Sequence, residues 1–117
     1  MLSTIASFSD CIVSFKILIQ EIRSDLSKTK IAVTFNDGSV IFLREIIIQN
    51  VLMDYAYHWQ KADGTLLIRW DNPAHYPEIA THPHHKHVGS DINVQPSYEQ
   101  NLFQVLSFIK SELINIP

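Results

Sequence analysis

Hydrophobic and polar residues alternate through the first part of the chain, which is the pattern of strands that bury one face. In the segment 11–22, CIVSFKILIQEI, the odd positions from Cys11 to Ile19 are apolar, whereas Ser14, Lys16 and Gln20 take the other face. Its β-branched and aromatic residues favour a strand over a helix. We predict a strand here, preceded by a short helix.

Two hairpins are predicted next. Residues 30–36 alternate and lead through Asp37-Gly38 into a further alternating segment, residues 39–48. The same plan recurs where residues 55–60 lead through Asp63-Gly64 into residues 66–71. Asp-Gly pairs between alternating segments are a strong hairpin signal. Together with residues 11–22, these segments predict about five strands in an antiparallel meander.

The second hairpin also predicts which residues face each other. If Asp63-Gly64 is a two-residue turn, Ala62 pairs with Thr65, and His58 then lies opposite Arg69. The aromatic residues of the hairpin fall on one face, which we expect to be core. His58, Arg69 and Asp71 fall on the other face and are available for chemistry, although a solvated sheet face would look the same.

Residues 72–97 break the alternation. They hold four of the five prolines and five of the six histidines. Because prolines at 73, 77 and 83 remove backbone donors, we predict a long irregular loop rather than sheet, apart from a short edge piece. Structureless loops of this length in small domains are often functional.

A helix is predicted after this loop. Apolar residues recur there at helical spacing, and Ser97 followed by Gln100 resembles a capping box. The stripe that should pack on the sheet consists of Leu102, Val105, Leu106, Ile109 and Leu113. The sequence thus predicts an α+β fold in one domain, residues 1–117. An antiparallel meander of about five strands carries the C-terminal helix on one face, with the long His/Pro-rich loop crossing an edge or the other face.

Composition limits the classes of function. The chain has 117 residues, 46% of them hydrophobic, enough for one domain with a core. The single cysteine, Cys11, forms no internal disulfide, and neither a leader nor a bilayer-spanning run is evident, so we expect a cytoplasmic protein with no membrane contact. A net charge of −3 argues against strong nonspecific attraction to nucleic acid.

The histidines leave three interpretations open. Imidazoles bind transition metals, and His85 and His87 share one side of an extended segment. Alternatively, His58, His84, His85 and His87 supply protons for RNA cleavage by its 2′-hydroxyl, with Arg69 or Lys86 holding the phosphate. In the third interpretation, the imidazoles only bond backbone carbonyls and stiffen the loop. Asp71 either shapes a turn or orients a histidine by accepting its ring N–H.

Three blocks in this order resemble the TumE family of small bacterial and archaeal toxins: YAYHWQKADGTLLIRWDN, AHYPE and PHHKHVG, followed by the helix. The resemblance implies a toxin of a toxin–antitoxin pair, a cognate helix-turn-helix antitoxin and an RNA-directed activity. Tyr76 and His82 depart from the family's pattern, so neither is assigned an essential role. The matching positions are Tyr57, His58, Trp59, Arg69, Trp70, Asp71, Asn72, His75, Pro83, His84, His85 and His87.

From residues and resemblance together, the leading hypothesis is a toxin that cleaves RNA with no obligatory metal or other cofactor. The alternatives are a non-catalytic toxin that binds a cellular target and a metal-binding regulatory domain, and a homo-oligomer stays open. The predicted catalytic residues are His58, Arg69, Asp71, His84, His85 and His87.

Overall fold

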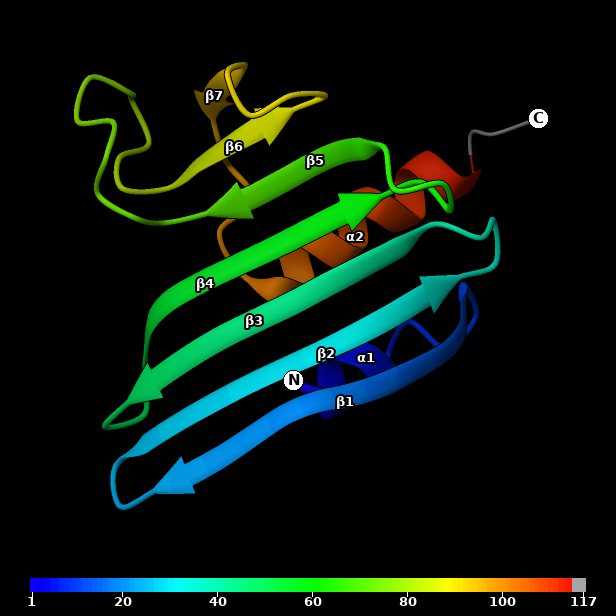
Figure 1. The fold of residues 1–117 in the computed structure, drawn as a ribbon, viewed down its shortest axis with the longest axis horizontal. Coiled ribbons are helices and arrows are strands. Elements are labelled where there is room, and N and C mark those ends of the chain that lie inside the picture. Colours follow the sequence, from blue (N-terminus) through cyan, green and yellow to red (C-terminus); the bar gives the residue numbers. More distant parts are fainter. Residues whose placement is uncertain (115–117) are drawn as a thin grey trace.

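The alternating segments of the sequence pair into one curved antiparallel sheet, in which every strand lies beside its neighbour in the chain (Figure 1). We describe this fold from a computed structural model, in which residues 1–114 are placed. Among those residues the elements are α1 (Leu2–Ala6), β1 (Ile12–Arg23), β2 (Leu26–Phe35), β3 (Val40–Ile48), β4 (Val51–Gln60), β5 (Leu66–Asp71), β6 (His85–Val88), β7 (Val94–Pro96) and α2 (Leu102–Ile114).

The predicted α+β class and antiparallel meander are confirmed, but the number of strands is wrong. The sheet of residues 1–114 has seven strands rather than five. The two additional strands, β6 and β7, lie inside the segment that we expected to be an irregular loop. Its prolines do not block them, because Pro83 precedes β6 and Pro96 ends β7, the edge strand, where a missing backbone donor costs little.

The predicted pairing of the second hairpin is confirmed, although its turn is longer than expected. His58 lies opposite Arg69, but the turn spans residues 61–65 and is closed by Lys61 N–H donating to Thr65 O at 2.9 Å. Ala62 therefore does not pair with Thr65. The register shifts between Trp59 and Gln60, and this irregularity compensates for the longer turn.

The start of α2 also differs from the prediction. Asn101 caps the helix, since its Oδ1 accepts a hydrogen bond from the backbone N–H of Gln104 at 2.9 Å. Ser97 instead donates its hydroxyl to Glu99 O at 2.8 Å, and Gln100 donates its side-chain amide to Ser97 O. The Ser97–Gln100 pair thus stabilises the turn before the helix rather than the helix itself.

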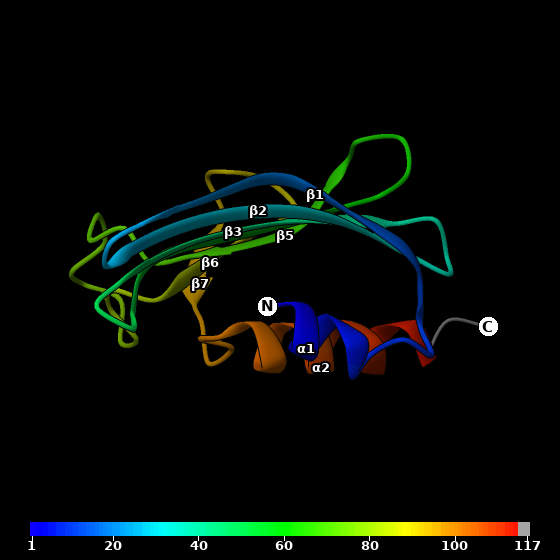
Figure 2. The same cartoon turned by 90° about the horizontal axis from the view of Figure 1, so that it is seen from below.

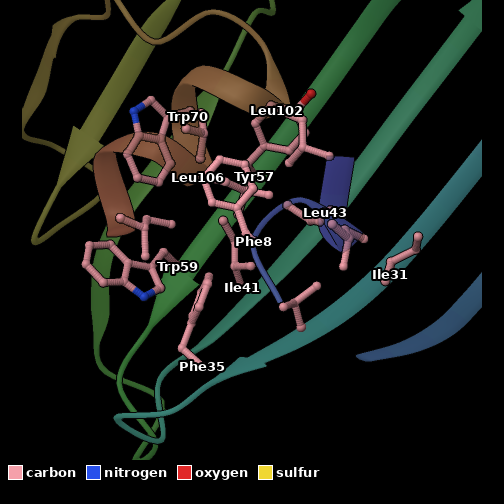
Figure 3. Close-up of a cluster of buried hydrophobic side chains, with 14 of the residues drawn as sticks. Phe8, Ile31, Phe35, Ile41, Leu43, Tyr57, Trp59, Trp70, Leu102 and Leu106 are labelled. Atoms are coloured by element: carbon pink, nitrogen blue, oxygen red, sulfur yellow. The ribbon is translucent and has the colours of Figure 1, made fainter. Parts of the chain in front are cut away.

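Both helices of the described part of the chain lie against the same face of the sheet (Figure 2). Between α2 and the sheet, the apolar side chains form one continuous core, seen in Figure 3. Trp70 is fully buried, stacks on Trp59 with ring centroids 6.4 Å apart and meets the ring of Phe108 edge-on. In residues 1–114, neither helix is long and apolar enough to cross a bilayer.

We expect Leu106→Ala to lower the free energy of unfolding by about 2 to 5 kcal/mol, because the side chain is 1% exposed in this core and its removal leaves a cavity. Glu112→Ala, on the exposed side of the same helix, is the matched control and should change it by less than about 0.5 kcal/mol. Urea denaturation of the three proteins measures both values. Equal losses in the two variants would contradict the assignment of the buried face.

Candidate functional site

Four polar side chains meet on the face of the sheet that points away from α2. Asp71 lies opposite His85, and Arg69 lies opposite His87, in the antiparallel pair β5 and β6. Paired residues share a face, and residues two apart in a strand do so as well. The register of this one strand pair therefore brings Arg69, Asp71, His85 and His87 together, and we call these four residues the Asp71 cluster.

The carboxylate of Asp71 lies at the centre of the cluster and is only 6% exposed. Its Oδ1 is 2.7 Å from Nε2 of His85 and 3.4 Å from Nε2 of His87. Its Oδ2 is 3.5 Å from Nε of Arg69. A single buried carboxylate thus has two imidazoles at one oxygen and a guanidinium at the other.

The opposite nitrogen of each imidazole is fixed by the backbone. Nδ1 of His85 lies 3.0 Å from the carbonyl oxygen of Pro83, and Nδ1 of His87 lies 2.9 Å from that of Asp91. Because a carbonyl oxygen only accepts hydrogen bonds, each Nδ1 carries the proton and donates it. In a neutral ring, Nε2 then presents its lone pair to Asp71.

Tyr76 covers the two imidazoles, although its sequence position predicts no role for it in the site. Its ring centroid lies 4.8 Å from that of His85 and 6.2 Å from that of His87, edge-on in both cases. It comes from the irregular segment between β5 and β6, which thus packs over the face away from α2. Asp91 also contributes to the site and is not among the predicted residues. Only its position shortly after His87 indicates that its carbonyl oxygen could reach the His87 ring.

His58 and Arg69 form the accessible side of the site. His58 is half-buried on β4, directly opposite Arg69. Burial lowers the pKa of the His58 imidazole, and the positive charge of Arg69 lowers it further. His58 is therefore neutral at pH 7. The side chain of Arg69 is 34% exposed, and its Nη1 lies 3.6 Å from Oδ1 of the exposed Asp91.

His84 and Lys86 are not brought to this face. Because they alternate with the cluster residues along β6 and its entry, they point toward α2. Nδ1 of His84 is 2.8 Å from the hydroxyl of Tyr55, and burial lowers the His84 pKa. Lys86 pairs with Glu99 at 3.3 Å. The structure thus unites five of the six predicted residues and separates His84.

The arrangement offers three kinds of chemistry in one place. A neutral imidazole at His58 can accept a proton, and the guanidinium of Arg69 can bind a phosphate oxygen. The third component is Asp71 with the two imidazoles, a set of ligand atoms that all lie within 4.8 Å of one another. These three side chains could hold a metal ion or share protons.

A family model described as Toxin TumE matches residues 1–113. The match spans all seven strands and most of α2, and it includes every residue of the Asp71 cluster. Comparison with curated proteins and with solved structures finds no match.

We expect the pKa of His58 to lie below its ordinary value of 6.5 and to rise in Arg69→Gln, because that change removes the neighbouring positive charge but keeps the burial. His84 is an internal control in the same spectra. Its pKa is lowered by burial and then by His85, so it should titrate at the same pH in both proteins. Titration of the imidazole C–H signals by NMR measures both. An unchanged His58 midpoint would contradict the contact.

Proposed function

The chain belongs to the TumE toxin family, and from that premise we propose that it is an RNA-directed endonuclease that acts through the accessible side of the Asp71 cluster. Membership makes it the toxin component of a toxin–antitoxin system and implies a cognate antitoxin. We further propose that this antitoxin is a helix-turn-helix protein. The proposed reaction is attack of an RNA 2′-hydroxyl on the adjacent phosphodiester.

The observation that carries the proposal is the position of the site at the end of a basic, helix-free face. Rows of paired residues cross the sheet on this face, and one row runs from Lys16 through Phe42 and His58 to Arg69. Six of the nine Lys and Arg residues lie on it: Lys16, Arg23, Lys28, Lys30, Arg44 and Arg69. Of these basic residues on the face, only Arg44 and Arg69 pair with carboxylates of the described part of the chain.

This surface suits an extended polyanion better than a small substrate. Basic side chains along a sheet bind a nucleic-acid backbone, and an aromatic ring such as Phe42 offers a stacking surface for a base. Two hollows near the opposite edge, one lined by Met1, Ile31 and Glu45 and one by Ile22, Ser27 and Ile47, belong to the face that carries the helices and contain no cluster residue. The net charge of −3 does not prevent such binding, because the positive charge is local.

The roles of the residues follow from their protonation and exposure. His58, neutral at pH 7, takes the proton of the 2′-hydroxyl, and the oxygen then attacks phosphorus. Arg69 binds a non-bridging phosphate oxygen and stabilises the charge that develops there. The P–O5′ bond breaks, leaving a 2′,3′-cyclic phosphate. The departing O5′ takes a proton from a solvent water molecule, and His58 returns its proton to the resulting hydroxide. Asp71 lies beside Arg69 and helps to hold the guanidinium in position.

We expect purified protein to cut total RNA into fragments that end in 2′,3′-cyclic phosphate. His58→Gln and Arg69→Gln should each lower the rate by about 100-fold or more, since each removes a group used in the transition state. His82→Ala, an exposed histidine of the same irregular segment, should cleave at the wild-type rate. Gel analysis of the fragments and their ends measures all three.

Growth of cells that express the same variants separates this proposal from a non-catalytic toxin. If toxicity requires His58 and Arg69, it should disappear in the variants that lose cleavage. Toxicity that survives both changes, with no RNA cut by the wild-type protein, would contradict the nuclease and favour a toxin that binds its target.

A further inference from the structure

The ligand atoms of Asp71, His85 and His87 converge on one point in a geometry that suits a cation, and we propose that they bind one divalent transition-metal ion of the zinc class. The inference deepens the proposed function by naming what the buried part of the site holds. Metal binding is one of the three interpretations that the sequence leaves open for the histidines. The contacts within the folded chain favour it.

The lone pairs of the two imidazoles point toward the carboxylate of Asp71. Both Nδ1 atoms donate to backbone carbonyls, so both Nε2 atoms are acceptors when the rings are neutral. They face Oδ1 of Asp71, which is also an acceptor, at 2.7 and 3.4 Å. Three acceptors that converge without a donor between them repel one another. A positive ion bound by all three turns this repulsion into attraction.

Hydrogen bonding does not satisfy the central oxygen of Asp71. Asp71 Oδ1 is fully buried and accepts no aligned hydrogen bond, despite its short distance to His85. An unsatisfied buried carboxylate oxygen is costly. One shared proton would bridge one of the two imidazole–carboxylate pairs and leave the other unbridged. One metal ion bridges all three atoms.

The two distances from the imidazole nitrogens to Asp71 are close to those between ligands of a zinc ion. Zinc binds His nitrogen and carboxylate oxygen at about 2.1 Å in a tetrahedron, which places ligand atoms about 3.4 Å apart. The His87 to Asp71 distance already has this value, and the His85 to Asp71 distance must widen by a fraction of an ångström. Two histidines and one carboxylate leave one position for water or substrate, as in catalytic zinc sites.

The surroundings of the three ligands complete the match. Metal-binding histidines donate their second ring nitrogen to a carbonyl or carboxylate, as both do here. Arg69 lies at Oδ2 and leaves Oδ1 free for the metal. With neutral imidazoles, the two carboxylates of Asp71 and Asp91 outnumber the single guanidinium, so the positive charge of an ion is tolerated.

The test uses the full chain, stripped with chelator, incubated with zinc chloride and freed of excess metal by gel filtration. Elemental mass spectrometry should find one zinc per chain. Zinc at 100 times its dissociation constant should raise the melting temperature by roughly 10 °C, whereas calcium should not, because imidazole is a poor calcium ligand. Less than half a zinc per chain, with no thermal shift, would overturn the proposal.

Two variants distinguish the buried site from adventitious binding by exposed histidines. The double variant His75→Ala/His82→Ala removes two exposed imidazoles and should bind zinc like the wild type. Asp71→Asn should bind it more than about 100-fold more weakly, beyond the effect expected of a residue that only supports a ligand. Loss of zinc from the double variant, or full retention by a folded Asp71→Asn protein, would contradict the assignment.

The same samples separate this inference from the proposed function. RNA cleavage at full rate by zinc-free protein that also takes up no zinc would contradict the metal site and leave the nuclease standing. Stoichiometric zinc without RNA cleavage would support the metal site and contradict the nuclease.

Discussion

Asp71 ends β5 with a carboxylate that is almost entirely removed from water, and Arg69, His85 and His87 gather around that charge. A buried carboxylate is costly unless cations or donors surround it, so the chain must bring such groups to it. The antiparallel pairing of β6 with β5 does so, because its register sets His85 directly opposite Asp71 and His87 opposite Arg69. Tyr76 then covers the two imidazoles from the segment that connects the strands.

This one constraint links the fold to the proposed chemistry. The face that bears the cluster is free of the helices, so Arg69 and His58 stay within reach of a polymer lying on the sheet, while Asp71 and the two histidines stay behind them. The exposed and buried residues of the site therefore have different roles. A proton acceptor and a phosphate ligand lie at the surface, and the buried residues can hold a positive ion. His84, one residue before β6, takes no part because alternation turns it to the other face, against Tyr55.

The sequence predicted the central hairpin of the site but not its outer strand. Period-two alternation and an Asp-Gly turn sufficed to place His58 opposite Arg69, even though the turn proved longer, because a register shift preserved the faces. The strand β6 was missed because its four residues, HKHV, are too few and too polar to show alternation of hydrophobicity, and Pro83 lies just before them. What makes this segment a strand is its pairing partners, which depend on tertiary contacts. The contact of Tyr76 with the two imidazoles depends on tertiary packing, which the spacing of residues in the sequence does not predict.

A crystal structure grown with zinc chloride, with diffraction measured on both sides of the zinc absorption edge, tests the account most directly. The account predicts an anomalous peak about 2.1 Å from Nε2 of His85, Nε2 of His87 and Oδ1 of Asp71, with both Nδ1 atoms still bonded to carbonyls. An absence of anomalous density there, with Asp71 instead accepting aligned hydrogen bonds from both imidazoles, would show that protons and not a metal hold the buried carboxylate, and would contradict the central claim.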